Sequence, residues 1–315
     1  MPQAKSHWLI TGGAGFIGSH LAQALVAQGQ QVTIVDNLTS GNLHNLEPFR
    51  DKISFIQADI CDLSALVKAF ATVDYVLHHA AFISVAESMA KPQETARINV
   101  LGTQTVLEAA RQCGVKRVVF ASSAAVYGTL PGFPYKETSP TDYQSPYAWS
   151  KQAGTELCQL YTKSFGLETV ILRYFNVYGP RQNPNAVYAA VVAKFMQLAA
   201  ANQPLGIDWD GKQSRDFINV ADIVQANLLA VQKGVPGEIY NVASGQTYTL
   251  LELADTIEKI SGRKLARVSR PKRPGDVHES SANIDKIRAL GFNPKITLET
   301  GLREMWQTEK SYSTK

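Results

Sequence analysis

The stretch Trp8–Gly18, which reads WLITGGAGFIG, decides the fold of this chain. Its first four residues form a short apolar run that predicts a β-strand, and a helical pattern begins near Phe16. Gly12 and Gly15 lie between the strand and the helix and let the chain turn tightly, and Gly18 lies in the first turn of the helix. A strand, a glycine-rich turn and a helix in this order open a βαβ unit, so the sequence predicts a sheet of parallel strands.

The rest of the chain continues this alternation. Short, continuously apolar runs suit strands that are buried on both faces of a parallel sheet, and they lie at Val32–Asp36, Ile53–Gln57, Tyr75–His79, Arg117–Ala121, Val170–Phe175 and Glu238–Val242. Helical patterns occupy Phe16–Gln28, Leu63–Ala71, Gln93–Cys113, Tyr147–Phe165 and Ala221–Gln232. This order predicts an α/β fold with a doubly wound parallel sheet, the Rossmann arrangement, with right-handed crossovers.

The alternation breaks after Phe175. Residues 176–215 and 244–315 contain loops, prolines and shorter helices, of which Leu250–Ser261 is the clearest. We therefore expect two domains. Residues 1–175 and 216–243 would form the large domain, and residues 176–215 and 244–315 would form a smaller C-terminal lobe that caps the sheet and binds the substrate.

The glycine-rich turn also predicts a dinucleotide cofactor. A helix N-terminus offers N–H groups and the positive end of a dipole to a pyrophosphate, and glycines allow it to approach closely. Asp36 ends the second strand, where a carboxylate accepts hydrogen bonds from an adenosine ribose and repels a 2′-phosphate. No Lys or Arg lies between Asp36 and Arg50, so the sequence favours NAD over NADP. Asp59 and Ile60 could lie beside the adenine, but Asp59 could equally cap the helix near Leu63.

The segment Tyr147-Ala148-Trp149-Ser150-Lys151 places a phenol and an amine four residues apart. On a helix, this spacing puts both side chains on one face. A nearby ammonium stabilises a phenolate and lowers the pKa of a tyrosine from its usual ~10, so Tyr147 becomes a proton acceptor near neutral pH. A half-buried Tyr beside a solvated Lys is the ordinary alternative. The glycine-rich turn and the run Phe120-Ala121-Ser122-Ser123 favour the catalytic interpretation.

The composition excludes several classes of protein. The 315 residues are 45% hydrophobic and 18% charged, and the 31 basic residues are spread along the chain, so no nucleic-acid partner is expected. Three cysteines without a Cys-x-x-Cys motif support neither a metal site nor a disulfide framework. The chain has no signal-peptide pattern and no apolar span of about 18 residues, so we expect a reduced, cytoplasmic protein without a membrane partner.

Over nearly its whole length, the chain resembles the extended short-chain dehydrogenases/reductases. The motifs that carry the resemblance are TGGAGFIG at 11–18, HHAA at 78–81, FASSAAVYG at 120–128, YAWSK at 147–151, LRYFNVYGPRQ at 172–182, SRDF at 214–217 and RPGD at 273–276. Within that group the chain resembles the nucleotide-sugar 4-epimerases, in particular the UDP-N-acetylhexosamine 4-epimerases of bacterial polysaccharide pathways.

The resemblance implies that Ser123, Tyr147 and Lys151 are catalytic. Tyr147 would take the proton of the sugar 4-hydroxyl, Lys151 would lower its pKa and bind the nicotinamide ribose, and Ser123 would hydrogen-bond the same hydroxyl. The C4 hydride would pass to NAD, the 4-keto sugar would rotate about its diphosphate link, and the hydride would return to the opposite face. Further cofactor contacts are implied for Phe16, Ile17, Asn37, Ala80, Tyr147 and Tyr174.

The resemblance also implies a substrate site for a UDP-sugar. Asn176, Arg215 and Arg273 match positions that hold the nucleotide diphosphate, and an Arg fork suits phosphate oxygens. Asp276 would meet the uridine ribose. Ser84 would lie near the diphosphate or the sugar.

Ser280 carries the expectation about specificity. In the resembling epimerases, the residue four after the Asp of this motif lines the wall beside the sugar C2 group. A bulky aromatic there leaves room only for a 2-hydroxyl, whereas a Ser leaves room for an N-acetyl group. We therefore expect UDP-GlcNAc and UDP-GalNAc to be accepted, alongside UDP-Glc and UDP-Gal. Ala124-Ala125 stand where many relatives carry a Ser or Thr, so one hydroxyl that could touch the sugar is missing.

Other functions compete with this one. A nucleotide-sugar 4,6-dehydratase typically needs an Asp-Glu pair, and a UDP-glucuronate decarboxylase usually a Glu, where this chain has Ala124-Ala125. A UDP-glucuronate 4-epimerase shares the epimerase residues and stays an alternative. A non-catalytic NAD-binding sensor is the alternative outside enzymes, but such relatives tend to lose Tyr147 or Lys151.

The helical stretches Gln93–Cys113 and Tyr147–Phe165 carry apolar residues at helical spacing. In the resembling family, the matching pair meets its symmetry mate in a four-helix bundle, so we expect a homodimer. Spacing alone does not distinguish a face that packs on the sheet from one that packs on a partner.

Overall fold

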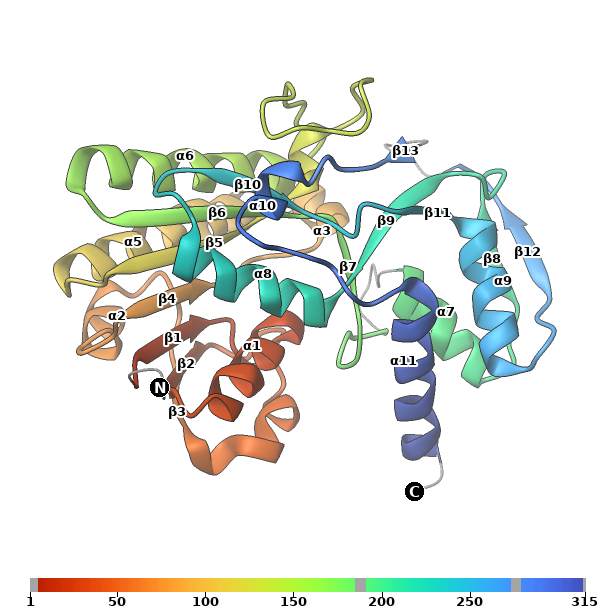
Figure 1. Ribbon diagram of the computed structural model, residues 1–315, viewed down its shortest axis with the longest axis horizontal. Coiled ribbons are helices and arrows are strands. Elements are labelled where there is room, and N and C mark those ends of the chain that lie inside the picture. Colours follow the sequence, from red (N-terminus) through yellow and green to blue (C-terminus); the bar gives the residue numbers. More distant parts are fainter. Residues whose placement is uncertain (1–4, 185–190, 273–278, 314–315) are drawn as a thin grey trace.

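The computed structural model describes residues 5–184, 191–272 and 279–313, and its centre is a sheet of seven parallel strands in the order β10-β6-β5-β4-β1-β2-β3 (Figure 1). These strands are β1 His7–Thr11, β2 Gln31–Asp36, β3 Ile53–Gln57, β4 Tyr75–His78, β5 Arg117–Ser123, β6 Glu168–Tyr174 and β10 Ile239–Val242. All seven coincide with the predicted strands to within two residues at either end. The predicted fold class is confirmed.

Helices cover both faces of this sheet because successive strand residues point to opposite sides. These helices are α1 Phe16–Ala27, α2 Leu63–Ala69, α5 Gly102–Gln112, α6 Pro146–Phe165 and α8 Val220–Lys233. Trp8 and Ile10 of β1 pack into the core under α1 and α8, whereas Leu9 packs into the core under α2, α5 and α6. The 3-10 helix Leu43–Lys52 packs beside α1.

The stretch predicted as one helix over Gln93–Cys113 has three parts. They are α4 Pro92–Ala96, a π-helical segment Arg97–Leu101 and α5. Asn99 lies in the π-helical segment and turns its amide inward, where it pairs with both the N–H and the C=O of Phe82 at 2.7 and 3.0 Å. The interruption therefore accompanies a tertiary contact that a hydrophobic pattern does not encode.

A third hydrophobic core lies outside the large sheet, at the right of Figure 1. There, β9 Ser214–Asn219 pairs with β7 Asn176–Tyr178, β11 Thr247–Thr249 and β13 Glu279–Ser280, and β8 Leu205–Asp208 pairs with β12 Arg267–Arg270. The helices α7 Val191–Ala200, α9 Leu250–Ser261 and α11 Leu298–Ser313 contribute to this core. Of the two remaining short helices, α3 Val85–Ala90 packs against α4 and α6, and α10 Asp285–Arg288 packs against β10 of the large sheet. The expected boundary at residue 216 falls inside β9, and the chain rejoins the large sheet at α8.

Among the described helices, none is both long and apolar enough to cross a membrane. The described residues also contain no group of three or more His, Cys, Asp or Glu side chains that could hold a metal ion.

Candidate active site

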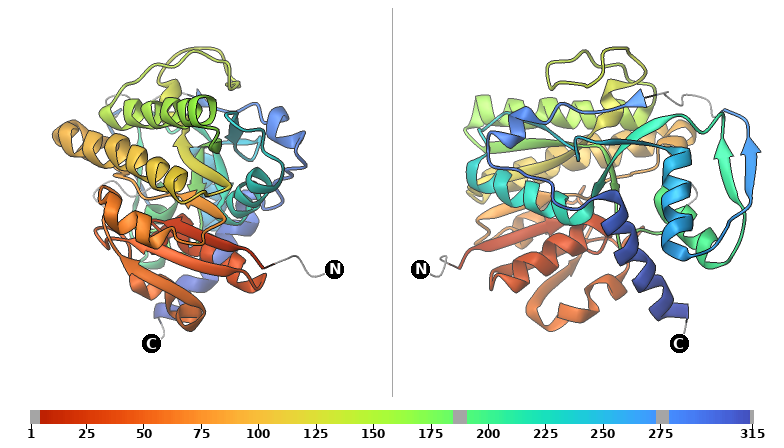
Figure 2. Two further views of the ribbon diagram at one scale, coloured as in Figure 1. Left: turned by 90° about the vertical axis from the view of Figure 1, so that its left-hand side faces the viewer. Right: turned by 45° about the vertical axis from the view of Figure 1, so that its right-hand side comes forward.

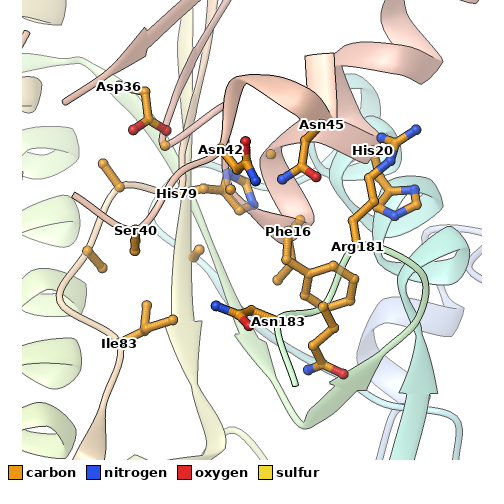
Figure 3. A pocket seen from close by; sticks show the side chains of 18 of the residues that line it. Phe16, His20, Asp36, Ser40, Asn42, Asn45, His79, Ile83, Arg181 and Asn183 are labelled. Atoms are coloured by element: carbon orange, nitrogen blue, oxygen red, sulfur yellow. The ribbon is translucent and has the colours of Figure 1, made fainter. Parts of the chain in front are cut away.

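A cavity of about 1710 Å³ opens where β1, β2 and β4 end (Figure 3). Ligands of doubly wound sheets bind outside the carboxyl ends of the strands, so this is the expected place for a cofactor. Every residue predicted to contact the cofactor lines this cavity, and so does Ser84. The set comprises Gly12, Gly15, Phe16, Ile17, Gly18, Asp36, Asn37, Asp59, Ile60, Ala80, Ser84, Tyr147, Lys151 and Tyr174.

The glycine-rich turn fits a pyrophosphate. Gly12 has a φ of +70°, and a Cβ there would stand 2.7 Å from the Ala80 nitrogen. A Cβ on Gly18 would overlap the Gly12 carbonyl, so helix and turn could not approach as they do. Gly15 caps α1 but has no side chain to bond the first N–H groups of the helix. These N–H groups and the positive end of the helix dipole therefore face the cavity.

Asp36 is buried at the end of β2, with both carboxylate oxygens engaged by the backbone. Its Oδ1 accepts from the Leu38 N–H at 2.8 Å, and its Oδ2 accepts from the Ala14 N–H at 3.0 Å. Burial raises the pKa of Asp36, and these two hydrogen bonds oppose the rise. Each oxygen keeps a lone pair for a ribose hydroxyl. The contact of Asp36 with the adenosine ribose stays a prediction.

Asp59 does not cap the following helix, which corrects one of the two alternatives drawn from spacing. Asp62 is the cap of α2, and its carboxylate accepts from the Ala65 N–H at 3.0 Å. Asp59 instead accepts from the Cys61 N–H at 2.9 Å and forms a 3.4 Å ion pair with Arg97. Backbone hydrogen bonding to Cys61 and the Arg97 charge hold the pKa of Asp59 below its usual value, against the opposing effect of desolvation.

Tyr147 and Lys151 lie in the first two turns of α6 and both face the cavity. The Lys151 Nζ donates to the Ala121 carbonyl at 2.9 Å and stands 5.9 Å from the centre of the Tyr147 ring. Burial lowers the pKa of Lys151 to about 8.

The sequence predicted a lowered pKa for Tyr147, and this net direction needs correction. Burial raises the pKa of Tyr147, and a hydrogen bond with Ser123 is the effect that opposes the rise. Desolvation disfavours the charged phenolate more strongly than this hydrogen bond favours it. Ser123 therefore favours the phenolate form that the predicted role of Tyr147 as a base requires.

Two serines that sequence reasoning missed hold Tyr147 by its backbone, and a buried asparagine holds one of them. The Ser88 Oγ accepts from the Tyr147 N–H at 3.2 Å, and the Ser150 Oγ donates to the Tyr147 carbonyl at 2.7 Å. Asn99 donates to the Ser150 Oγ at 2.9 Å. A buried amide in a helix interior is costly unless it is bonded, so Asn99 on the apolar face of its helix was the available signal.

Tyr174 lies at the end of β6 and is fixed from two sides. Its hydroxyl lies 3.0 Å from the His79 Nε2 and accepts from the Asn227 Nδ2 at 2.8 Å. Burial raises the pKa of Tyr174 and lowers that of His79 to about 3, so both stay neutral. Neither group is placed to act as a base at neutral pH.

The residues predicted to bind the substrate divide into two groups. Ser84 caps α3 by accepting from the Glu87 N–H at 3.1 Å, and Ser123 ends β5, where it accepts from the Ala125 N–H at 3.1 Å. The other group lies on the small sheet. Asn176 on β7 donates to the Asp216 carbonyl at 3.0 Å, and Ser280 on β13 pairs with Arg215 on β9. Arg273 and Asp276 lie outside the described residues.

This fold and this cavity define a class: an α/β enzyme that binds a dinucleotide at a glycine-rich turn, beside a Tyr-x-x-x-Lys pair. Comparison with known proteins narrows the class. The profile of the NAD dependent epimerase/dehydratase family matches residues 8–243. The chain therefore belongs to the NAD-dependent epimerase/dehydratase family.

Relatives act on several UDP-sugars. The chain is 39% identical over 303 residues to the UDP-glucose 4-epimerase of Mycolicibacterium smegmatis, covering 93% of this chain and 95% of that protein. The UDP-N-acetylglucosamine 4-epimerase of Methanobrevibacter ruminantium M1, solved with UDP-N-acetylmuramic acid, has a TM-score of 0.93 and 37% identity over 97% of this chain and 99% of its own. The UDP-glucuronic acid 4-epimerase of Bacillus cereus, solved with UDP-glucuronic acid and NAD, has a TM-score of 0.90 and 31% identity. The match covers 97% of this chain and 99% of that chain.

The enzyme is accordingly an isomerase of the UDP-sugar 4-epimerase group, and NAD is its cofactor. The expected family, fold, enzyme class and cofactor are confirmed. The sugar is not decided by these relatives because three different sugars occur among them.

Proposed function

We propose that the enzyme interconverts UDP-GlcNAc and UDP-GalNAc by inverting C4, and that UDP-Glc and UDP-Gal are further substrates. The observation that carries this proposal is the small side chain of Ser280, which sits opposite Arg215 in the β9–β13 pair. In this proposal Arg215 binds the diphosphate and Ser280 lines the wall beside the sugar C2 group. A serine at that wall leaves space for an acetamide.

Tyr147, Ser123 and Lys151 carry out the proton chemistry in this proposal. Tyr147 removes the proton of the 4-hydroxyl, while Ser123 hydrogen-bonds the same hydroxyl and the Tyr147 phenol. When bound, NAD supplies the group that accepts and returns the C4 hydride. Lys151 holds its ammonium beneath the Tyr147 ring and adds positive charge to the site.

The 4-keto sugar has to turn between the two hydride transfers, so the enzyme should hold the nucleotide firmly and the sugar loosely. Asn176 and Arg215 belong to adjacent strands of the small sheet and are assigned to the nucleotide side, together with Arg273 and Asp276. Ala124-Ala125 follow Ser123 and are assigned to the sugar side. Their short side chains offer few contacts that would prevent rotation.

The proposal is tested by incubating the purified enzyme separately with UDP-GlcNAc, UDP-Glc and UDP-glucuronate and following the 4-epimers by proton NMR. Conversion of UDP-GlcNAc is expected. Ser280→Tyr should abolish that conversion and keep that of UDP-Glc, whereas Ser280→Ala should keep both. Retention of UDP-GlcNAc turnover by Ser280→Tyr would overturn the assignment of the wall. Turnover of UDP-glucuronate alone would replace the proposed substrate.

We also infer that two copies of the enzyme pair through α5 and α6. The helices lie side by side over one face of the large sheet (Figure 2). Exposed large apolar residues lie on α6 and on the π-helical segment that leads into α5, namely Trp149, Leu160 and Phe165 on α6 and Leu101 on that segment. Pairing would remove these side chains from water.

We place the enzyme in the cytoplasm, which its three free cysteines support.

A further inference from the structure

The fully buried amide of Asn241 on β10 has hydrogen-bond partners at both ends. Its Oδ1 accepts from the Tyr127 hydroxyl at 2.7 Å. Its Nδ2 donates to the Tyr135 carbonyl at 3.0 Å and to the Asn283 carbonyl at 3.4 Å. Its backbone N–H donates to the Glu137 carboxylate at 2.8 Å.

These bonds join two segments that are far apart in the chain. One segment begins directly after Ser280, and the other runs from Ser123 at the end of β5 toward the start of α6. The two also bond to each other, because the Tyr135 N–H donates to the Ser281 carbonyl and the Asn283 N–H donates to the Tyr135 carbonyl, both at 2.9 Å. Asn241 thus closes a junction between the proposed substrate wall and the catalytic side of the site.

The chain is therefore held in place on both sides of Ser280. On one side Ser280 pairs with Arg215 in the β9–β13 ladder. On the other side, the residues that follow it are held against Tyr135 by the backbone bonds and by the Asn241 amide. A change at Asn241 would release only the second of these sides.

The junction is rigid because its other members are themselves fixed. The side chain of Arg173 is buried and donates to the Tyr127 hydroxyl at 3.1 Å and to the Glu137 carbonyl at 3.3 Å. The Tyr127 and Tyr135 rings stack with their centres 4.6 Å apart. Since Arg173 donates to the Tyr127 oxygen, the Tyr127 proton is directed at the Asn241 Oδ1, which leaves the amide nitrogen for the two carbonyls.

We propose that Asn241 is a positioning residue for substrate specificity, which sets how far the Ser280 wall stands from Ser123 and Tyr147. This inference rests on the proposed function, in which Ser280 lines the C2 group. An apolar residue of similar size would fill the same volume in β10. Only an amide satisfies two carbonyl acceptors and one hydroxyl donor at once. The hydrogen bonds of Asn241 therefore fix the position of the segment that follows Ser280, which filling the same volume would not do.

The test is Asn241→Asp, with KM and kcat measured separately for UDP-GlcNAc and UDP-Glc. The new side chain has the same shape but presents an oxygen to the Tyr135 and Asn283 carbonyls, which repel it. The segment after Ser280 should then move away. We expect the KM for UDP-GlcNAc to rise by about tenfold, while the KM for UDP-Glc changes by less than about threefold, because the acetamide reaches the wall and the 2-hydroxyl does not.

Val242→Ala is the matched control. Val242 is the next residue of β10 and is fully buried, so its truncation lowers stability without touching the junction. It should leave the ratio of the two KM values unchanged. An unchanged ratio in Asn241→Asp, with both activities falling in parallel, would overturn the proposal and leave Asn241 a structural residue.

Tyr127→Phe gives a second measurement if Asn241→Asp does not fold. It keeps the ring stack and removes only the hydroxyl that orients the amide, so the ratio should shift in the same direction by a smaller amount. No shift would overturn the proposal. Wild-type turnover of UDP-GlcNAc and its loss in Ser280→Tyr test the proposed function separately. If these hold while the ratio is unchanged in Asn241→Asp and Tyr127→Phe, only the role of Asn241 fails.

Discussion

At the scale of single residues, the proposed mechanism depends on the balance of charge and burial around Tyr147. Each pKa unit corresponds to about 1.4 kcal/mol between the two protonation states. Burial raises the pKa of Tyr147, and it lowers the pKa of Lys151 to about 8, because both charged forms lose water. The phenolate and the ammonium form more readily together than either forms alone.

Lys151→Met should therefore move the pH dependence of the reaction. Without the ammonium, the pKa of Tyr147 rises further, and a base with a higher pKa loses its proton only at higher pH. The ascending limb of kcat/KM against pH should shift to higher pH, and kcat/KM at pH 7 should fall. Steady-state kinetics from pH 6 to 10 measure this. An ascending limb at the wild-type position would show that Lys151 does not act on Tyr147.

Tyr147→Phe separates an enzyme that uses this base from a protein that only binds NAD. Loss of a positioned base should lower kcat by about 10²–10⁴. NAD binding, measured by fluorescence titration, should stay within a few-fold of wild type because the glycine-rich turn is untouched. Full activity on every UDP-sugar that the wild type converts would remove Tyr147 from the mechanism.

At the scale of elements, the cofactor site depends on how closely α1 approaches the turn before it. Gly18→Ala places a Cβ against the Gly12 carbonyl, so turn and helix have to separate. Overpacking of this kind costs about 1–3 kcal/mol. Because the N–H groups that face the pyrophosphate move with the helix, we expect a loss of roughly tenfold in NAD affinity.

Gly29→Ala is the control for Gly18→Ala. Gly29 follows the other end of α1 and has a φ of +74° with open space around it. An alanine there costs stability through backbone strain alone. Its NAD affinity, measured by calorimetry, should equal that of the wild type. Equal losses of affinity in the two variants would mean that the turn does not depend on close packing at Gly18.

The large sheet could be predicted from the sequence because strands buried on both faces are continuously apolar and the helices between them are long. The small sheet could not. Strands β7, β11 and β13 have two or three residues each, too few for a pattern. The contacts of Asn99 with Phe82 and of Asn241 with Tyr135 join residues far apart in the chain, so no local signal announces them. Burial of Tyr147 likewise depends on the folded chain, which explains the wrong direction expected for its pKa.

At the scale of the whole molecule, the outer side of α5 and α6 should mediate assembly. Light scattering should give twice the chain mass of 34.4 kDa. Leu160→Arg places a charge on the exposed apolar side of α6 and should shift the mass to that of one chain. Val268→Arg, at an equally exposed apolar residue on β12, should leave the mass unchanged. A wild-type mass of one chain would contradict the homodimer.

The central claim is that this NAD-dependent enzyme inverts C4 of an acetylated UDP-sugar. The most direct measurement is the proton NMR spectrum of UDP-GlcNAc incubated with the purified enzyme and NAD. We predict that signals of UDP-GalNAc appear and grow to a constant ratio, and that the same ratio is reached from UDP-GalNAc. An unchanged UDP-GlcNAc spectrum, with conversion of UDP-Glc or UDP-glucuronate under the same conditions, would contradict the claim.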